Sequence, residues 1–288
     1  MYEKVLPRMR EQDIFIGQPL PQDGFNASRP QSDERSSITS RVVREYKNNP
    51  VFLIMPYTHD PLYVSWSKEL VADLGKNPNG GLILVGGKIW ERNWDKSPFA
   101  QIKIPPKIHV EMGINPADYP RVKHSFNPKG KRRFFYIGHD AWYKNTSQLE
   151  EIAKSLPDFE FAHIGGGSLK GWKKIDEFAS LTPQYMSEIA RNYDIFVNTS
   201  SADAQATTIL ENMCFGFPIA TTYEAGYDFP SLIQLSTTDT VYNTKALLRL
   251  QDMDESELLE IANVNRKAAE SFHGWSKFTD TILNFMKI

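Results

Sequence analysis

Residues 198–222 read NTSSADAQATTILENMCFGFPIATT, and this stretch decides the fold class. It follows an apolar run, YDIFV, that is typical of a buried parallel strand. The pattern predicts a helix from about Ala204 and a further strand, FPIATT, after Gly216. Asp203 and Glu211 are separated by seven residues, or about two helical turns. If Asp203 caps this helix, it holds a polar group at the helix mouth while Glu211 reaches back along the same wall.

Strand-like and helix-like segments alternate along most of the chain. Apolar runs predict strands at residues 13–17, 51–55, 81–85, 107–112, 133–138, 159–165, 193–200 and 217–222. Helical patterns lie between them at residues 36–49, 145–156 and 182–193. Several strands are continuously apolar, as parallel strands covered on both faces are. The alternation predicts an α/β fold.

Prolines, a glycine and basic residues cluster at 115–133, between two predicted strands, and indicate a domain boundary. We therefore predict an N-terminal domain over 1–120 and a C-terminal domain over 121–272. The end of the chain reads as two helices broken at His273–Gly274. Residues 273–288 are thus expected to form a separate terminal helix.

The composition excludes several classes of protein. A formal net charge of −2 over 288 residues gives no general attraction to nucleic acid. Cys214 is the only cysteine, so no intramolecular disulfide can form and a reducing compartment is expected. We see neither a secretory signal nor an apolar run of about 18 residues. We expect a cytoplasmic protein, and peripheral contact with a membrane stays open.

Three predicted strands end in loops that suit a phosphate ligand. YIGHDAWYKN supplies Gly138, His139 and Lys144, and HIGGGSL supplies the glycines at 165–167. In an open parallel sheet, the loops that follow the strands share one edge, where ligands bind. The helix predicted from Ala204 directs its free N–H groups and partial positive charge to that same edge. The pattern predicts an anion site there.

Five segments together resemble the later part of a known enzyme family. They are KIHVEMGINPADYP, YIGHDAWYKN, HIGGGSL, YDIFVNTSSADAQATTILENMCFGFPIATT and FHGWSKF. In order and spacing they resemble the retaining glycosyltransferases of family 4, which have the GT-B fold. The resemblance implies two Rossmann-like α/β domains facing a cleft, with a terminal helix that crosses back to the first. Only about 50 residues precede VFLIMPYTHDP, so the N-terminal, acceptor-side domain is expected to be abbreviated.

The resemblance implies catalytic roles for three residues. Lys144 stands where the family binds the donor diphosphate and stabilises the leaving group. Asp203 stands where the family usually has a glutamate that contacts the donor sugar near its reacting carbon. His59, in MPYTHDP, resembles the family's N-domain histidine beside the donor sugar.

Further residues are implied to bind the donor. Glu211 would bind the ribose hydroxyls, and His139 replaces the family's phosphate-binding arginine with a group that titrates near neutrality. AQAT also replaces a glycine-containing loop, which implies an altered sugar pocket. The backbone and turn positions implied to line the donor are Gly138, Gly166, Gln205, Ala206, Thr207 and Thr208.

The implied reaction moves a sugar from a nucleotide-diphosphate-sugar donor to a hydroxyl of a glycan or glycolipid, with retention. Neither a metal nor another cofactor is expected. DMD at 252–254 reads as a helix cap, and the six histidines lack the paired spacing of a zinc site. No nucleic-acid partner is expected, while a homo-oligomer or a partner subunit stays open.

Two other functions remain open at this point. One is a different enzyme on the same architecture, such as a nucleotide-sugar epimerase or a phosphorylase. The other is a degenerate nucleotide-sugar-binding module that needs a partner for catalysis. Plainer interpretations also exist, since Asp203 is a natural N-cap, Glu211 suits an exposed helix surface and Cys214 suits a packed core.

Overall fold

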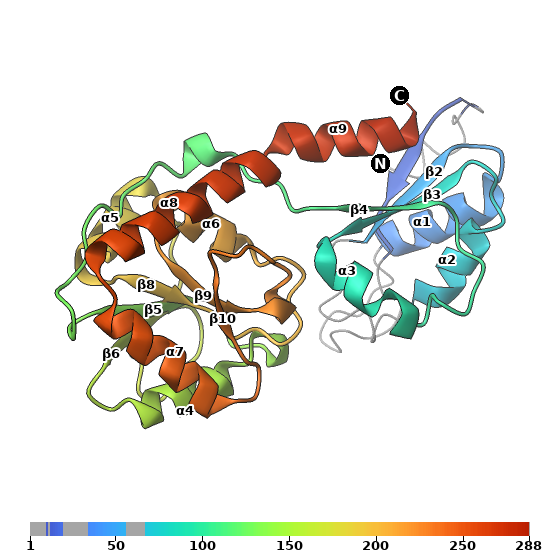
Figure 1. Ribbon diagram of the computed structural model, residues 1–288. Coiled ribbons are helices and arrows are strands. Elements are labelled where there is room, and N and C mark those ends of the chain that lie inside the picture. The colour runs from blue at the N-terminus through green and yellow to red at the C-terminus, as the bar shows by residue number, and fades with distance from the viewer. Residues whose placement is uncertain (1–9, 11, 20–33, 56–66, 288) are drawn as a thin grey trace. The chain divides into compact units, whose positions relative to one another are not determined.

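The computed structural model of the chain describes residues 10, 12–19, 34–55 and 67–287. The chain divides into two compact units (Figure 1). One unit comprises Met1–Val110 with Asp280–Ile288, and the other comprises Glu111–Thr279. Each unit is an α/β structure with a parallel sheet, which confirms the predicted fold class.

The first unit is built on a four-stranded sheet. Its strands, in spatial order, are β1 (Phe15–Gly17), β2 (Val51–Met55), β3 (Gly80–Val85) and β4 (Lys107–Val110). Its helices are α1 (Glu34–Glu45), α2 (Lys68–Leu74) and α3 (Lys88–Asn93). Leu53 of β2 and Leu82 of β3 lie in one buried cluster with Trp90 of α3. The Trp90 indole N–H donates to the Val85 carbonyl oxygen at 3.1 Å, so its one polar group is satisfied inside the core.

The second unit contains a six-stranded parallel sheet in the spatial order β10–β9–β8–β5–β6–β7. The strands are β5 (Arg133–Ile137), β6 (Glu160–Ile164), β7 (Lys173–Asp176), β8 (Ile195–Val197), β9 (Ile219–Thr222) and β10 (Ile233–Leu235). From β5 the chain builds outward to β7, and it then returns to the other side of β5 to place β8. The direction of winding therefore reverses between β5 and β8. Such a topological switch point is where open α/β sheets bind ligands.

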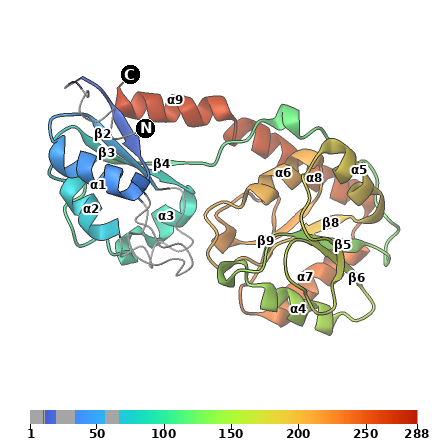
Figure 2. The same cartoon turned by 180° about the vertical axis from the view of Figure 1, so that it is seen from behind.

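Helices cover both faces of this sheet (Figures 1 and 2). The helices are α4 (Thr146–Ser155), α5 (Pro183–Asn192), α6 (Thr207–Phe215), α7 (Thr240–Asp252) and α8 (Glu255–Phe272). The last helix, α9 (Trp275–Met286), passes into the first unit, to which Asp280–Ile288 belong. One buried cluster holds side chains of α5 and α6, and a second holds side chains of α4 and α7. The strands are apolar on both sides because both sides are covered. No helix of the described residues combines the length and the hydropathy that crossing a bilayer requires.

Each of the eight predicted strands is present, with ends that differ by a few residues. β7 and β10 were not predicted. Both are edge strands of three or four residues, and β7 reads KKID, so neither shows a continuous apolar run. The break between α8 and α9 at His273–Gly274 is as predicted, and Asp254 caps α8 with Glu257 in a capping box.

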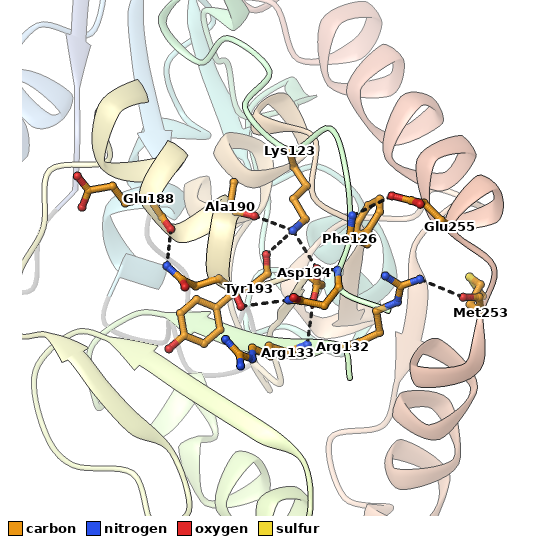
Figure 3. Close-up of polar contacts among 12 residues, drawn as sticks. Lys123, Phe126, Arg132, Arg133, Glu188, Ala190, Tyr193, Asp194, Met253 and Glu255 are labelled. Carbon is orange, nitrogen blue, oxygen red and sulfur yellow. Dashed lines mark hydrogen bonds and ion pairs between the residues drawn. The ribbon is translucent and has the colours of Figure 1, made fainter. Parts of the chain in front are cut away.

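The two units divide after Val110, whereas the sequence placed the boundary after residue 120. Residues 111–120 pack on the second unit, where Ile114 N–H donates to the His273 carbonyl oxygen at 2.6 Å and Met112 N–H donates to Gln205 Oε1 at 2.6 Å. The chain that follows is held there through Lys123, whose side chain is 2% exposed (Figure 3). Its ammonium group donates to two backbone carbonyl oxygens at 2.7 Å and to Asp194 Oδ1 at 2.9 Å. A buried ion pair of this kind fixes the segment in place, and sequence spacing alone gives no sign of it.

Candidate functional site

The candidate site lies at the switch point of the second unit, where the loops after β5 and β8 emerge side by side. The loop after β5 carries Gly138, His139 and Lys144, and the loop after β8 carries Asp203. Ser201 N–H in the second loop donates to the Tyr143 carbonyl oxygen in the first at 2.7 Å. The fold therefore brings the two loops into direct contact.

Lys144 and Asp203 form an ion pair at the centre of this site. The Lys144 ammonium group donates to Asp203 Oδ2, and Ser200 Oγ donates to the same oxygen at 3.3 Å. The two charged side chains are only 11% and 10% exposed. An ion pair this little exposed to water is screened less than a surface pair. Two of the predicted catalytic residues are thus brought together from positions 59 residues apart.

Asn145 holds Lys144 in place, and sequence reasoning missed it. Its backbone is left-handed, with φ 53° and ψ 46°, a conformation that asparagine tolerates better than most residues. Its side-chain amide donates to the carbonyl oxygens of Thr199 at 3.1 Å and Thr237 at 2.8 Å. Thr199 Oγ1 donates back to the Asn145 carbonyl oxygen at 3.1 Å. The signal in the sequence was an asparagine directly after the candidate lysine, as the first residue of a predicted helix.

Helix α6 begins at Thr207, and Ala206 is its N-cap residue. The predicted start near Ala204, with Asp203 as the cap, is therefore wrong. The reason is that the Asp203 carboxylate is held by Lys144 and Ser200 instead of by a helix N–H. The first-turn N–H groups of α6 have no side-chain cap.

Glycines allow the loop after β6, at residues 165–167, to approach the backbone of the loop after β5 closely. A Cβ atom on Gly165, where φ is 142°, would lie 1.9 Å from the Gly138 carbonyl oxygen, so no other residue fits there. A Cβ on Gly138 would lie 2.2 Å from the Tyr136 hydroxyl. By contrast, a Cβ on Gly166 would meet nothing within 4 Å. Gly166 therefore borders open space at the carboxyl end of β6.

Glu211 lies on α6 and is largely removed from water, in contrast to an exposed helix position. Burial raises the pKa of its carboxyl group, while a hydrogen bond from the Tyr119 hydroxyl, at 3.4 Å to Oε1, partly offsets that effect. A buried carboxylate with one neutral donor retains capacity to accept further hydrogen bonds.

His139 is exposed, and its Nε2 lies 3.0 Å from the Tyr143 hydroxyl. Gln205 is buried, and its side chain points to the segment at 111–112, where Oε1 accepts from Met112 N–H at 2.6 Å. Its own backbone N–H donates to the Asp203 carbonyl oxygen at 3.0 Å. His59 lies outside the described residues.

Across the described part of the chain, no three His, Cys, Asp or Glu side chains are grouped to hold a metal ion. Cys214 lies in the last turn of α6, fully buried in the core, and burial raises the pKa of its thiol to about 11. A buried thiol with a raised pKa contributes to core packing and is a poor nucleophile.

No protein-family model and no curated protein matches the sequence. Solved structures do match: TarM is 12% identical with a TM-score of 0.74, over 99% of this chain and 57% of that chain. Sucrose-phosphate synthase from Thermosynechococcus elongatus is 10% identical with a TM-score of 0.71, over 99% and 75%. The pneumococcal O-GlcNAc transferase GtfA is 13% identical with a TM-score of 0.64, over 99% and 58%.

The chain has the GT-B fold. Two parallel α/β units and matches over 99% of the chain support this assignment together. The chain spans 57% of the TarM chain, so the proteins it resembles are longer. At 10–13% identity these matches establish the fold, and the chemistry has to be argued from the site.

Proposed function

We propose that this GT-B chain is a retaining glycosyltransferase that uses a nucleotide-diphosphate-sugar donor. The observation that carries the proposal is the Lys144–Asp203 pair at the switch point, beside the open first turn of α6. A cation and uncapped N–H groups at one edge suit a diphosphate, and an adjacent carboxylate suits the hydroxyls of a sugar.

The structural neighbours support the donor class. GtfA was crystallised in complex with UDP and GlcNAc, and a second neighbour, from E. coli, is bound with UDP-2-fluoro glucose. Work on trehalose-6-phosphate synthase also concerns glycosyltransfer with retention. The fold that this chain shares with these neighbours is the reason to propose the same donor class for it.

In the proposed mechanism, the bond between the sugar C1 and the β-phosphate oxygen breaks, and its electron pair passes to that oxygen. Lys144 and the first-turn amides of Thr207 and Thr208 stabilise the charge that develops there. The acceptor hydroxyl forms the new bond to C1 on the same face, and its proton goes to the departing phosphate oxygen. Asp203 holds the sugar by its hydroxyls and keeps Lys144 in place.

Residues around the Lys144–Asp203 pair bind the rest of the donor. Glu211 accepts from the ribose hydroxyls, because it is a partly satisfied carboxylate on the α6 wall. His139 contacts the phosphates through its imidazole ring. Gly166 leaves room for the nucleotide, and Gly138 lets the loop after β5 pass close to the Tyr136 hydroxyl. The proposed acceptor is a glycan or glycolipid, and no metal or cofactor takes part. The protein is proposed to act in the cytoplasm, and contact with a membrane surface or with a second subunit is compatible with this role.

A second candidate is a nucleotide-sugar-binding module that needs a partner for catalysis. The favouring observation is that Asp203 already neutralises Lys144 and that a histidine stands at position 139. Binding of the nucleotide would then occur without transfer.

The test is a thermal-shift panel of UDP, GDP, ADP and their common sugar conjugates, followed by product analysis with the nucleotide that binds. A ligand at 100 times its Kd should stabilise the fold by about 2.7 kcal/mol. We expect one nucleotide family to raise the Tm, Glu211→Ala to abolish the shift, and Glu188→Ala, an exposed glutamate on α5, to keep it. Flat curves for every nucleotide would refute both candidates, and binding without a glycosylated product would favour the module.

A further inference from the structure

Gln205 has a backbone conformation that glutamine rarely adopts. Its φ is 58°, and among the described residues only Asn145 and Lys287 share a left-handed backbone without being glycine. This conformation is disfavoured for a residue with a Cβ atom and persists only where the surroundings hold it. Glycine would fit the backbone at no such cost, so the glutamine side chain must contribute something.

The Gln205 side chain joins three segments of the second unit. Its Oε1 accepts from Met112 N–H at 2.6 Å, and its Nε2 donates to a Glu111 carboxylate oxygen and to the Gly226 carbonyl oxygen, the latter at 3.3 Å. The residue is 2% exposed. Every polar atom of the amide is therefore used inside the protein, and none is directed at a ligand.

Further hydrogen bonds hold the rest of the 203–206 loop, which carries Asp203. Asp203 N–H donates to the Glu224 carbonyl oxygen at 2.9 Å, and Gln205 N–H donates to the Asp203 carbonyl oxygen at 3.0 Å. The buried Tyr227 hydroxyl donates to the carbonyl oxygen of Ala206, the N-cap residue of α6, at 3.0 Å. Residues 203–206 are thus fixed at each end, and Gln205 is the point at which they are tied to segment 111–112.

We propose that Gln205 is a positioning residue that acts through its amide bridge to Glu111. The bridge sets the direction of the 203–206 loop, and with it the placement of the Asp203 carboxylate and of the first turn of α6. Gln205 touches no substrate through its side chain in this arrangement. The proposed role in transfer rests on the proposed glycosyltransferase function, whereas the bridge itself can be tested independently.

The test compares Gln205→Glu, Glu111→Gln and the double variant E111Q/Q205E, with Gln184→Glu on the exposed surface of α5 as the matched control. Gln205→Glu removes the donor and sets a second carboxylate against Glu111. In the double variant the amide stands at position 111 and the carboxylate at position 205, so one hydrogen bond between the two side chains can form again. The bond to the Gly226 carbonyl oxygen is lost, because a carboxylate cannot donate it. We expect Gln205→Glu to lower kcat at least tenfold, with the Kd of the nucleotide changed less than threefold.

Transfer by E111Q/Q205E should recover to within about threefold of Glu111→Gln. A residue that contacts the donor directly would instead change the nucleotide Kd and gain nothing from the exchange, which would overturn the proposal. Urea unfolding of the wild type, the two single variants and the double variant gives the second readout. The effects of the two single changes on stability should be non-additive, because the side chains share one bond. Additive effects on the free energy of unfolding would overturn the proposed Gln205–Glu111 bridge, whether or not the wild type transfers sugar. If the effects on stability are non-additive but the wild type transfers no sugar, only the proposed glycosyltransferase function is refuted.

Discussion

At the residue scale, the positive charge of Lys144 is already paired with the Asp203 carboxylate in the absence of a ligand. Lys144 and Asp203 are each about 90% buried as side chains, and each leaves an uncompensated charge if the other is removed. A diphosphate would take up the remaining donors of the Lys144 ammonium group, which has three, while Asp203 keeps one of them. Asp203 therefore holds the Lys144 ammonium group in place and leaves its other donors for a ligand.

Lys144→Ala should lower kcat for transfer by about 100-fold or more, since it removes the main charge opposite the leaving phosphate. Steady-state kinetics with the donor identified in the thermal-shift panel would measure this. Lys154→Ala is the matched control, because Lys154 is an exposed lysine on α4 with 77% of its side chain accessible. A Lys144→Ala protein that folds normally and transfers at the wild-type rate would contradict the proposed role.

Glu211→Gln should raise stability while weakening nucleotide binding. Burial raises the folded-state pKa of Glu211 above its unfolded value, so the ionised group costs folding free energy at neutral pH. That cost is absent once both states are protonated, below the ordinary glutamate pKa of about 4.3. Urea unfolding should show the variant to be more stable at pH 7.5, with the difference vanishing toward pH 4. Equal stability of the two proteins at pH 7.5 would disprove the burial argument, and the exposed Glu188→Gln change serves as the control.

At the scale of the element, one buried polar cluster holds residues 123–133 on the second unit (Figure 3). Asp194 is fully buried and accepts from Lys123 Nζ, from the backbone N–H groups of Asn127 and Arg133, and from the Asn127 side chain, at 2.8–2.9 Å. Burial lowers the pKa of Lys123, and the nearby carboxylate partly restores it. The cluster ties residues 123–133 to the end of α5 and to Asp194, directly before β8.

Asp194→Asn should lower the free energy of unfolding by about 3 kcal/mol, because it leaves the Lys123 charge buried without its counter-ion. Chemical denaturation would measure the change. Glu160→Gln breaks a matched but exposed pair, in which Arg133 Nε lies 2.9 Å from a glutamate that is 63% exposed, and should cost less than about 1 kcal/mol. Similar losses for the two variants would mean that burial does not distinguish the pairs.

At the scale of the whole molecule, the GT-B chain contains two units, each with its own core and its own sheet. Proteins built this way commonly depart from two-state unfolding. The candidate donor site, with Lys144, Asp203 and Glu211, lies within Glu111–Thr279, so ligand binding should act on that unit first.

Differential scanning calorimetry should therefore resolve two transitions, and the nucleotide that binds should raise the temperature of only one. A ligand at 100 times its Kd supplies about 2.7 kcal/mol to the unit that binds it. Glu211→Ala should remove the shift, and Glu188→Ala should keep it. A single transition that moves as a whole with nucleotide would be evidence against independent units.

The sequence by itself determined the α/β class, the strands of both sheets apart from two short edges, and the loops at which the site lies. These follow from apolar runs and from glycines, which are properties of neighbouring residues along the chain. Only the tertiary structure decided that Asp203 pairs with Lys144 instead of capping α6, that Gln205 bridges to Glu111, and that the units divide after Val110. The physical reason is that these contacts join residues far apart in the chain, and their partners are set by the order of strands in the sheet, which local spacing does not encode.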